Sequence, residues 1–149
     1  MSESGPTLTV VLAEDDDGHA ALIHRNLVRA GLGAGFLRVH NGLELLNLLE
    51  RNEELQSRRL VVLLDVRMPH LDGIQTLSRL KGNRKTAAIP VYILTTTDDR
   101  RDIEQCFELG CNAYILKPVA YDAFSEAIHR LALFLQITCL PGGVSPATS

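Results

Sequence analysis

Residues 61–73 read VVLLDVRMPHLDG, which is an apolar run followed by a polar turn. The apolar run that contains its first four residues begins one residue earlier and covers residues 60–64 without a polar interruption, which is typical of a strand buried on both faces of a parallel sheet. The run ends at Asp65, and residues 66–73 have the composition of a turn that leads into a helix. Side chains at the carboxyl ends of such strands form the functional sites of doubly wound sheets. The sequence therefore predicts that Asp65 lies at a functional edge.

Four further apolar segments have the same character, and segments with helical spacing separate them. The other expected strands cover residues 8–13, 35–40, 91–94 and 113–116. The expected helices are one that ends at Gly31 and four that cover residues 43–55, 74–80, 99–109 and 121–137, with Gly110 as a left-handed cap. Strands that alternate with helices predict right-handed crossovers. The expected fold class is α/β, with a doubly wound five-stranded parallel sheet and helices on both faces.

Size and composition fit one ordinary globular domain. The 149 residues are 46% hydrophobic and 22% charged, with 15 basic and 18 acidic side chains and a net charge of −3. This charge argues against nucleic acid or an anionic membrane as a partner, and no apolar run approaches the ~18 residues of a membrane helix. Residues 1–6 are expected to be an N-terminal tail, residues 7–138 the domain, and residues 139–149 a flexible C-terminal tail. A cytoplasmic location and free thiols for the three cysteines are expected.

Polar side chains that suit phosphoryl chemistry follow four of the expected strands. Acidic residues 14–17 follow the first strand, Asp65 the third, Thr95 and residues 96–97 the fourth, and Lys117 the fifth. Carboxylates that converge at one edge would repel one another without a cation, and oxygen ligands of this kind suit Mg²⁺. Asp65 would act as the nucleophile on phosphorus, while Lys117 and Thr95 would contact the phosphoryl oxygens.

Each of these features alone has an ordinary structural explanation. Acidic residues after a strand are often helix caps or charges favoured by the helix dipole. A Lys-Pro pair, such as Lys117-Pro118, is often only a turn. The order of the four groups and their placement at one edge are specific, and we therefore favour the functional interpretation.

These motifs resemble the receiver domain of two-component response regulators, over about residues 7–138. The matching strings are VVLAEDD at 10–16, VVLLDVRMPHLDG at 61–73, PVYILTT at 90–96 and GCNAYILKP at 110–118. The resemblance implies a flavodoxin-like receiver fold. It also implies the following roles: Asp65 as phospho-acceptor; Glu14, Asp15, Asp65 and the backbone carbonyl of Arg67 as metal ligands; Lys117, Thr95 and Thr96 as phosphate contacts; Thr95 and Tyr114 as switch residues; and a cis peptide bond before Pro118. Glu14 departs from the aspartate of many members, and Thr96 stands where a smaller residue is common.

The resemblance implies a single-domain response regulator that accepts a phosphoryl group on Asp65 from a sensor histidine kinase. The reaction would need Mg²⁺, with Mn²⁺ as a substitute, and phosphorylation would switch partner binding. The last helix and the short tail are similar to those of stand-alone receivers that serve phytochrome-type kinases. A phosphorelay shuttle or a phosphate sink is the alternative. The chain would not be an enzyme beyond its own phosphorylation and dephosphorylation.

Three other functions fit the sequence less well. A phosphatase with an aspartate nucleophile would carry a general acid two residues later, where this chain has Arg67. A dinucleotide-binding module would need a glycine-rich turn after the first strand, where residues 14–17 are acidic instead. A degenerate receiver that takes no phosphate would not need Asp65, Thr95 and Lys117 to be intact.

The last helix carries apolar residues on two sides. One side is the expected core stripe, formed by Phe124, Ile128, Leu131 and Leu135. The other side carries Leu133, Phe134 and Ile137 where a monomer would show polar residues. In one interpretation the tail or the fourth helix covers these residues; in the other they form a contact surface. We expect a homodimer through the fourth helix, the fifth strand and the fifth helix.

Overall fold

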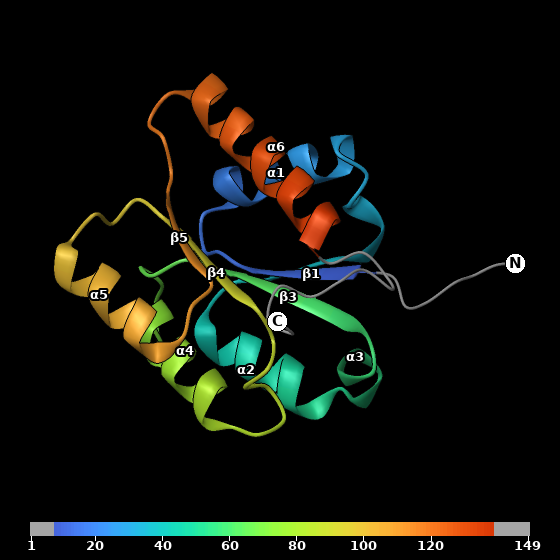
Figure 1. The fold of residues 1–149 in the computed structure, drawn as a ribbon, viewed down its shortest axis with the longest axis vertical. Helices are drawn as coiled ribbons and strands as arrows, with labels where there is room; N and C mark the ends of the chain where they lie inside the picture. Colours follow the sequence, from blue (N-terminus) through green and yellow to red (C-terminus); the bar gives the residue numbers. More distant parts are fainter. Residues whose placement is uncertain (1–7, 139–149) are drawn as a thin grey trace, which may run out of the picture.

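The computed structural model describes residues 8–138, in which five strands form one parallel sheet (Figure 1). The strand order is β2-β1-β3-β4-β5. The strands are β1 (Leu8–Ala13), β2 (Phe36–Val39), β3 (Arg59–Leu64), β4 (Val91–Thr95) and β5 (Ala113–Leu116). The α-helices are α1 (Asp17–Arg29), α2 (Gly42–Arg51), α3 (Glu53–Gln56), α4 (Gly73–Gly82), α5 (Arg100–Leu109) and α6 (Tyr121–Thr138). This arrangement confirms the expected fold class. The two expected tails, residues 1–6 and 139–149, lie outside the described residues.

Two hydrophobic cores lie on opposite faces of the sheet. Helices α1 and α6 cover one face, and α2, α3, α4 and α5 cover the other (Figure 1). Side chains of β1 alternate between the cores, since Val10 packs toward α1 and α6 whereas Val11 packs toward α2 and α4. Complete burial of a leucine such as Leu63 stabilises the fold by roughly 1.5–3 kcal/mol. The buried sheet therefore holds the strand ends in fixed positions.

Polar caps set where the helices begin and end. The Asp16 side chain accepts from the His19 backbone N–H at 2.9 Å and begins α1. Asp72 and Gln75 form a capping box that begins α4. Gly110 ends α5 with a φ of 105°, which confirms the expected left-handed cap. The caps at Asp16 and Asp72 lie on the loops that follow β1 and β3, and these loops carry polar residues at the carboxyl edge of the sheet.

The second expected helix, over residues 43–55, is divided in the structure. Helix α2 ends at Arg51, and the short α3 begins after Asn52. The Asn52 side chain accepts from the Leu55 backbone N–H at 3.1 Å, while its own backbone is extended. Asparagine offers the backbone a capping bond in place of helix continuation, and this local competition explains the break.

Candidate functional site

The polar residues predicted from the strand ends meet at the carboxyl edge of the central strands. Asp65 follows β3, while Glu14 and Asp15 follow the neighbouring β1. The Asp65 backbone N–H donates to the Ala13 carbonyl at 3.2 Å, which fixes the two strand ends relative to each other. Lys117 follows β5, and its side chain reaches the other two strands.

Three carboxylates form a cluster that fits a divalent cation. Glu14, Asp15 and Asp65 each offer an oxygen atom, and these atoms all lie within 4.8 Å of one another. Glu14 and Asp65 are buried, whereas Asp15 is exposed. Carboxylate oxygens of this kind, completed by water and a backbone carbonyl, match the preferences of Mg²⁺. The donor set therefore fits the expected metal.

The ammonium group of Lys117 lies between the two buried carboxylates. It donates to Glu14 Oε1 at 2.5 Å and to Asp65 Oδ2 at 3.1 Å. The ring nitrogen Nδ1 of His19 lies 3.0 Å from the same ammonium nitrogen. Sequence reasoning missed His19, because only the helical turn that begins at Asp16 brings it to the site. One ammonium group is thus shared between two buried carboxyl groups.

Burial raises the pKa of Glu14 from its usual 4.5 to about 7. Desolvation is the largest cause, the hydrogen bond from Lys117 opposes it, and the nearby Asp65 carboxylate adds to it. Although Lys117 is in contact, we expect desolvation to prevail because one ammonium group is shared between two buried acids. A second cation at this cluster would favour the ionised form of Glu14.

A close backbone contact holds the loop that carries Asp65. A Cβ atom at Gly73 would lie 2.2 Å from the Asp65 backbone oxygen, and the Gly73 N–H donates to the Val66 carbonyl at 2.8 Å. The Arg67 backbone N–H donates to Asp65 Oδ1 at 3.2 Å. Only glycine fits between α4 and the strand end, so residues 72–73 anchor the acceptor loop.

The loop after β4 carries the remaining predicted residues. Thr95 is buried, and its hydroxyl oxygen accepts from the Thr97 backbone N–H at 3.3 Å. Thr96 is exposed and, with Lys117, lines a cavity of about 650 Å³ between α1 and the start of α6. Tyr114 on β5 donates its hydroxyl hydrogen to the Thr97 carbonyl at 2.7 Å, and burial raises its pKa to about 12.

Two side chains near the site have contacts that sequence reasoning did not predict. The Arg67 guanidinium donates to Thr97 Oγ1 at 3.1 Å and to Asp102 Oδ2 at 3.0 Å, so it ties the acceptor loop to α5. Arg38 on β2 donates to the Glu14 backbone carbonyl. The sequence contains no local pattern that would have marked either contact, because each joins segments brought together only by the crossovers.

The expectation of a cis peptide bond before Pro118 is wrong. No cis bond occurs within residues 8–138, so the bond between Lys117 and Pro118 is trans. The trans form of such a bond is favoured by roughly 0.5–1 kcal/mol unless local contacts compensate. Lys117 reaches Glu14 and Asp65 with the trans bond in place.

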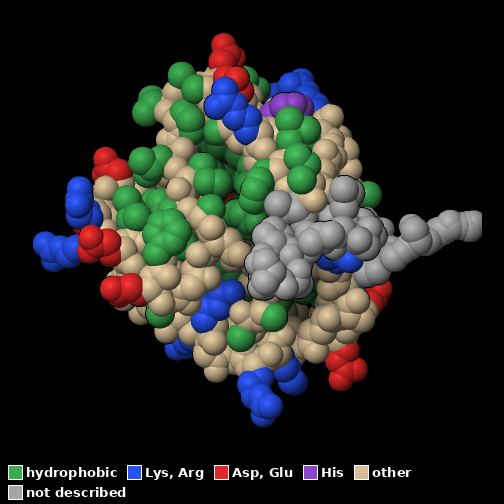
Figure 2. Space-filling model, in the orientation of Figure 1, with side chains coloured by type: hydrophobic (Ala, Val, Ile, Leu, Met, Phe, Trp, Pro, Cys, Tyr) green, Lys and Arg blue, Asp and Glu red, His purple; other side chains and the backbone are tan. Residues whose placement is uncertain are grey.

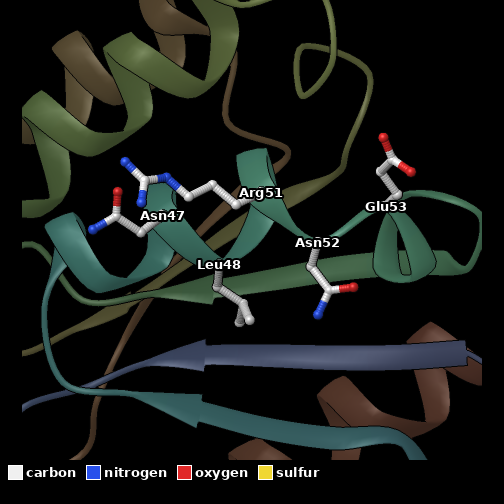
Figure 3. A pocket seen from close by; sticks show the side chains of 5 residues that line it. All are labelled: Asn47, Leu48, Arg51, Asn52 and Glu53. Carbon is white, nitrogen blue, oxygen red and sulfur yellow. The ribbon is translucent and has the colours of Figure 1, made fainter.

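A second cavity lies away from the carboxylates. It has a volume of about 470 Å³ and is lined by side chains of α2 and the turn into α3 (Figure 3). Glu53 is its one acidic side chain, and Arg51 is its one basic side chain. The residues that suit phosphoryl chemistry are therefore at the strand ends and not in this cavity.

Among the described helices, none combines the length and apolar composition needed to cross a bilayer.

Comparison with known proteins agrees with this site. The family model of the response regulator receiver domain matches residues 10–129. The chain is similar to the probable methanogenesis regulatory protein FilR2 of Methanothrix harundinacea, with 30% identity over 87% of this chain and 84% of that protein.

Two solved structures are also similar. One is a response regulator receiver domain from Rhodospirillum rubrum, with 42% identity, a TM-score of 0.81, and coverage of 89% of this chain and 96% of that one. The other is the bacteriophytochrome response regulator AtBRR, with 31% identity, a TM-score of 0.63, and coverage of 89% and 96%. The family match spans the strands that carry the carboxylates and Lys117. The chain therefore belongs to the response regulator receiver domain family of two-component phosphorelay signalling.

Proposed function

We propose that this receiver accepts a phosphoryl group on Asp65 from a sensor histidine kinase, in a Mg²⁺-dependent reaction that switches partner binding. The observation that carries the proposal is the placement of Asp65 within 4.8 Å of the Glu14 and Asp15 oxygens and 3.1 Å from the Lys117 ammonium nitrogen. A nucleophile, a metal-ligand set and a fixed cation thus occupy one edge. Phosphoryl transfer requires a positioned nucleophile and neutralisation of the charge on the phosphoryl oxygens, and these groups can supply both.

The reaction transfers a phosphoryl group from an imidazole nitrogen of the kinase to a carboxylate oxygen of Asp65. An Asp65 carboxylate oxygen forms a bond to phosphorus while the bond to the donor imidazole breaks, and its electron pair returns to the imidazole nitrogen. Mg²⁺, when held by Glu14, Asp15, Asp65 and the Arg67 carbonyl, would supply charge neutralisation at the phosphoryl oxygens. Lys117 would turn from Asp65 Oδ2 to a phosphoryl oxygen, and the Thr95 and Thr96 residues would contact the others.

Labelling with a small phosphodonor tests this proposal. Acetyl phosphate with Mg²⁺ should add one phosphoryl group, detected as a mass increase that disappears when hydroxylamine cleaves the acyl phosphate. Asp65→Asn should abolish the labelling, and Asp15→Asn should slow it by removing a ligand. Asp98→Asn, which removes an exposed acid from the loop after β4, is the matched control and should label normally. Full labelling of the Asp65→Asn protein would disprove the assignment.

The contacts of Arg67 disfavour the phosphatase alternative. Its guanidinium binds Thr97 and Asp102 and remains charged at neutral pH, so it offers no proton to a leaving group. We expect no turnover of small phosphate esters beyond the chain's own phosphorylation and dephosphorylation. A phosphorelay shuttle or a phosphate sink would use the same site and stays an alternative. The cytoplasmic location stays a prediction.

For the partner kinase we propose the phytochrome type. The support is the likeness to AtBRR, a bacteriophytochrome response regulator. Transfer from a purified, autophosphorylated phytochrome-type kinase should be faster by orders of magnitude than transfer from an unrelated histidine kinase. Equal rates would contradict this choice and leave the Asp65 proposal intact, since acetyl phosphate labelling tests that separately.

A further inference from the structure

The guanidinium group of Arg38 holds the backbone at the point where the acidic loop leaves the sheet. Its Nε donates to the Glu14 backbone carbonyl at 2.9 Å, and one terminal nitrogen donates to the same carbonyl at 2.7 Å. Its other terminal nitrogen donates to Asp17 Oδ1 at 2.8 Å. The Arg38 side chain is only 19% exposed, so its bonds to the Glu14 carbonyl are partly shielded from water, whereas its partner Asp17 is 87% exposed.

The sheet geometry shows why the Glu14 carbonyl takes a side-chain partner. Pairing between β1 and β2 ends with Ala13 opposite Val39. The Glu14 N–H still donates to the Val39 carbonyl at 3.1 Å. The Glu14 carbonyl lies just beyond the last paired residues, and Arg38 is its donor. Strand β2 therefore holds the Glu14 backbone on both of its peptide units.

This carbonyl belongs to the peptide that joins Glu14 to Asp15. A peptide unit is planar, so fixing its oxygen also fixes the orientation of the bond that leads into Asp15. Both side chains contribute oxygens to the cluster with Asp65. The contacts of Arg38 thus control how two of the three carboxylates are presented, although the guanidinium itself binds none of the three.

We propose that Arg38 is a positioning residue that orients Glu14 and Asp15 for a divalent cation by clamping the peptide between them. The inference rests on the proposed function, because it assumes that Mg²⁺ binds at this cluster. Charge alone predicts the opposite effect: a guanidinium near the site repels Mg²⁺, and its removal would tighten binding. Positioning predicts that removal weakens binding, so the sign of the change separates the two explanations.

The test measures Mg²⁺ affinity by isothermal titration calorimetry on metal-depleted protein. Arg38→Met should raise the dissociation constant about tenfold, as expected for loss of an outer-shell partner. Arg38→Lys, which keeps the charge and can donate to the carbonyl, should recover part of the affinity. In acetyl phosphate labelling, the Mg²⁺ concentration for half-maximal rate should rise by a similar factor, while the rate at saturating Mg²⁺ changes less than about threefold.

Two control variants separate the clamp from general effects. Arg58→Met removes an exposed arginine that pairs with Glu54 and precedes the start of β3, at the opposite end of that strand from Asp65, and it should leave Mg²⁺ affinity unchanged. Asp17→Asn removes the exposed ion pair but leaves the donors to the Glu14 carbonyl, and it should change the affinity less than about threefold. Far-ultraviolet circular dichroism checks that each variant is folded.

Three results would overturn the inference. Unchanged or tighter Mg²⁺ binding in folded Arg38→Met would show that the clamp does not position the ligands. Equal losses in Asp17→Asn and Arg38→Met would assign the effect to the ion pair and not to the carbonyl. If the wild-type protein neither binds Mg²⁺ nor labels at Asp65, the proposed function fails together with this inference. In the first two results the wild-type protein still binds Mg²⁺ and labels, so only the inference about Arg38 fails.

Discussion

Glu14 is almost completely buried beside Asp65, and this burial raises the pKa of its carboxyl group to about 7. In the unfolded chain the same group would titrate near 4.5. The folded protein therefore retains a proton that the unfolded chain loses as the pH rises. The stability that this protonated group contributes is complete below pH 4.5 and is lost as the pH rises through about 7.

This shift predicts the pH dependence of the metal-free protein. In a chelator, the free energy of unfolding should fall between about pH 5 and about pH 8, with Glu14 responsible for on the order of 2 kcal/mol. Glu14→Gln should be more stable than the wild type at the higher pH and similar to it at the lower one. Urea unfolding at several pH values measures both. The control variant Glu126→Gln, at an exposed ion pair of α6, should retain the wild-type pH dependence of the free energy of unfolding. A Glu14→Gln protein with that same pH dependence would refute the prediction.

At the scale of elements, the loop between β4 and α5 connects the site to β5. Thr95 ends β4, its hydroxyl accepts from the Thr97 N–H, and the Thr97 carbonyl accepts from the Tyr114 hydroxyl. A phosphoryl group that draws the Thr95 hydroxyl toward Asp65 would remove one of these bonds and strain the other. We therefore predict that this loop is a two-state element that phosphorylation of Asp65 would bias.

Thr95→Ala tests this connection. The variant should still be labelled at Asp65, yet the resonances of the Tyr114 ring should no longer change on phosphorylation. Nuclear magnetic resonance with ring-labelled tyrosine measures this, and Tyr114→Phe identifies the signal among those of Tyr92 and Tyr121. A Tyr114 shift of the wild-type size in phosphorylated Thr95→Ala would show that the hydroxyl does not couple the site to β5.

The same elements show what the sequence could and could not predict. The strands were predictable because their apolar runs, such as residues 60–64, are buried on both faces, and the strand ends located Asp65, Glu14 and Lys117. The break at Asn52 was not predicted, because the helical periodicity continues across the capping residue. Contacts such as the one between Arg38 and Glu14 depend on pairing of distant segments, which no local pattern records.

In the whole molecule, the face formed by α5, β5 and α6 exposes several large apolar side chains. The predicted contact residues Leu133, Phe134 and Ile137 of α6 are all exposed, and Ile137 is 72% exposed. Phe107 on α5 and Leu116 on β5 are exposed as well. Figure 2 views the side where β5 lies between α5 and α6, and hydrophobic side chains gather over this region. Exposed apolar side chains that gather on one face are typical of a contact site, and closed two-fold pairing is the commonest use of such a face.

We therefore expect a homodimer through α5, β5 and α6. Leu133→Arg combined with Phe134→Glu should give a folded monomer, because a charge in an apolar two-fold interface is buried twice. Light scattering over a range of protein concentrations, with and without acetyl phosphate, measures the mass. The Phe134 ring also packs edge-on against buried Tyr92, with centroids 6.2 Å apart, so Leu133→Arg alone provides a variant that keeps this contact. Leu43→Arg, at an exposed leucine of α2, should remain dimeric. A wild-type protein that stays monomeric at high concentration, with and without acetyl phosphate, would refute the dimer, because the exposed apolar residues of α6 would then not be covered by a second copy of the chain.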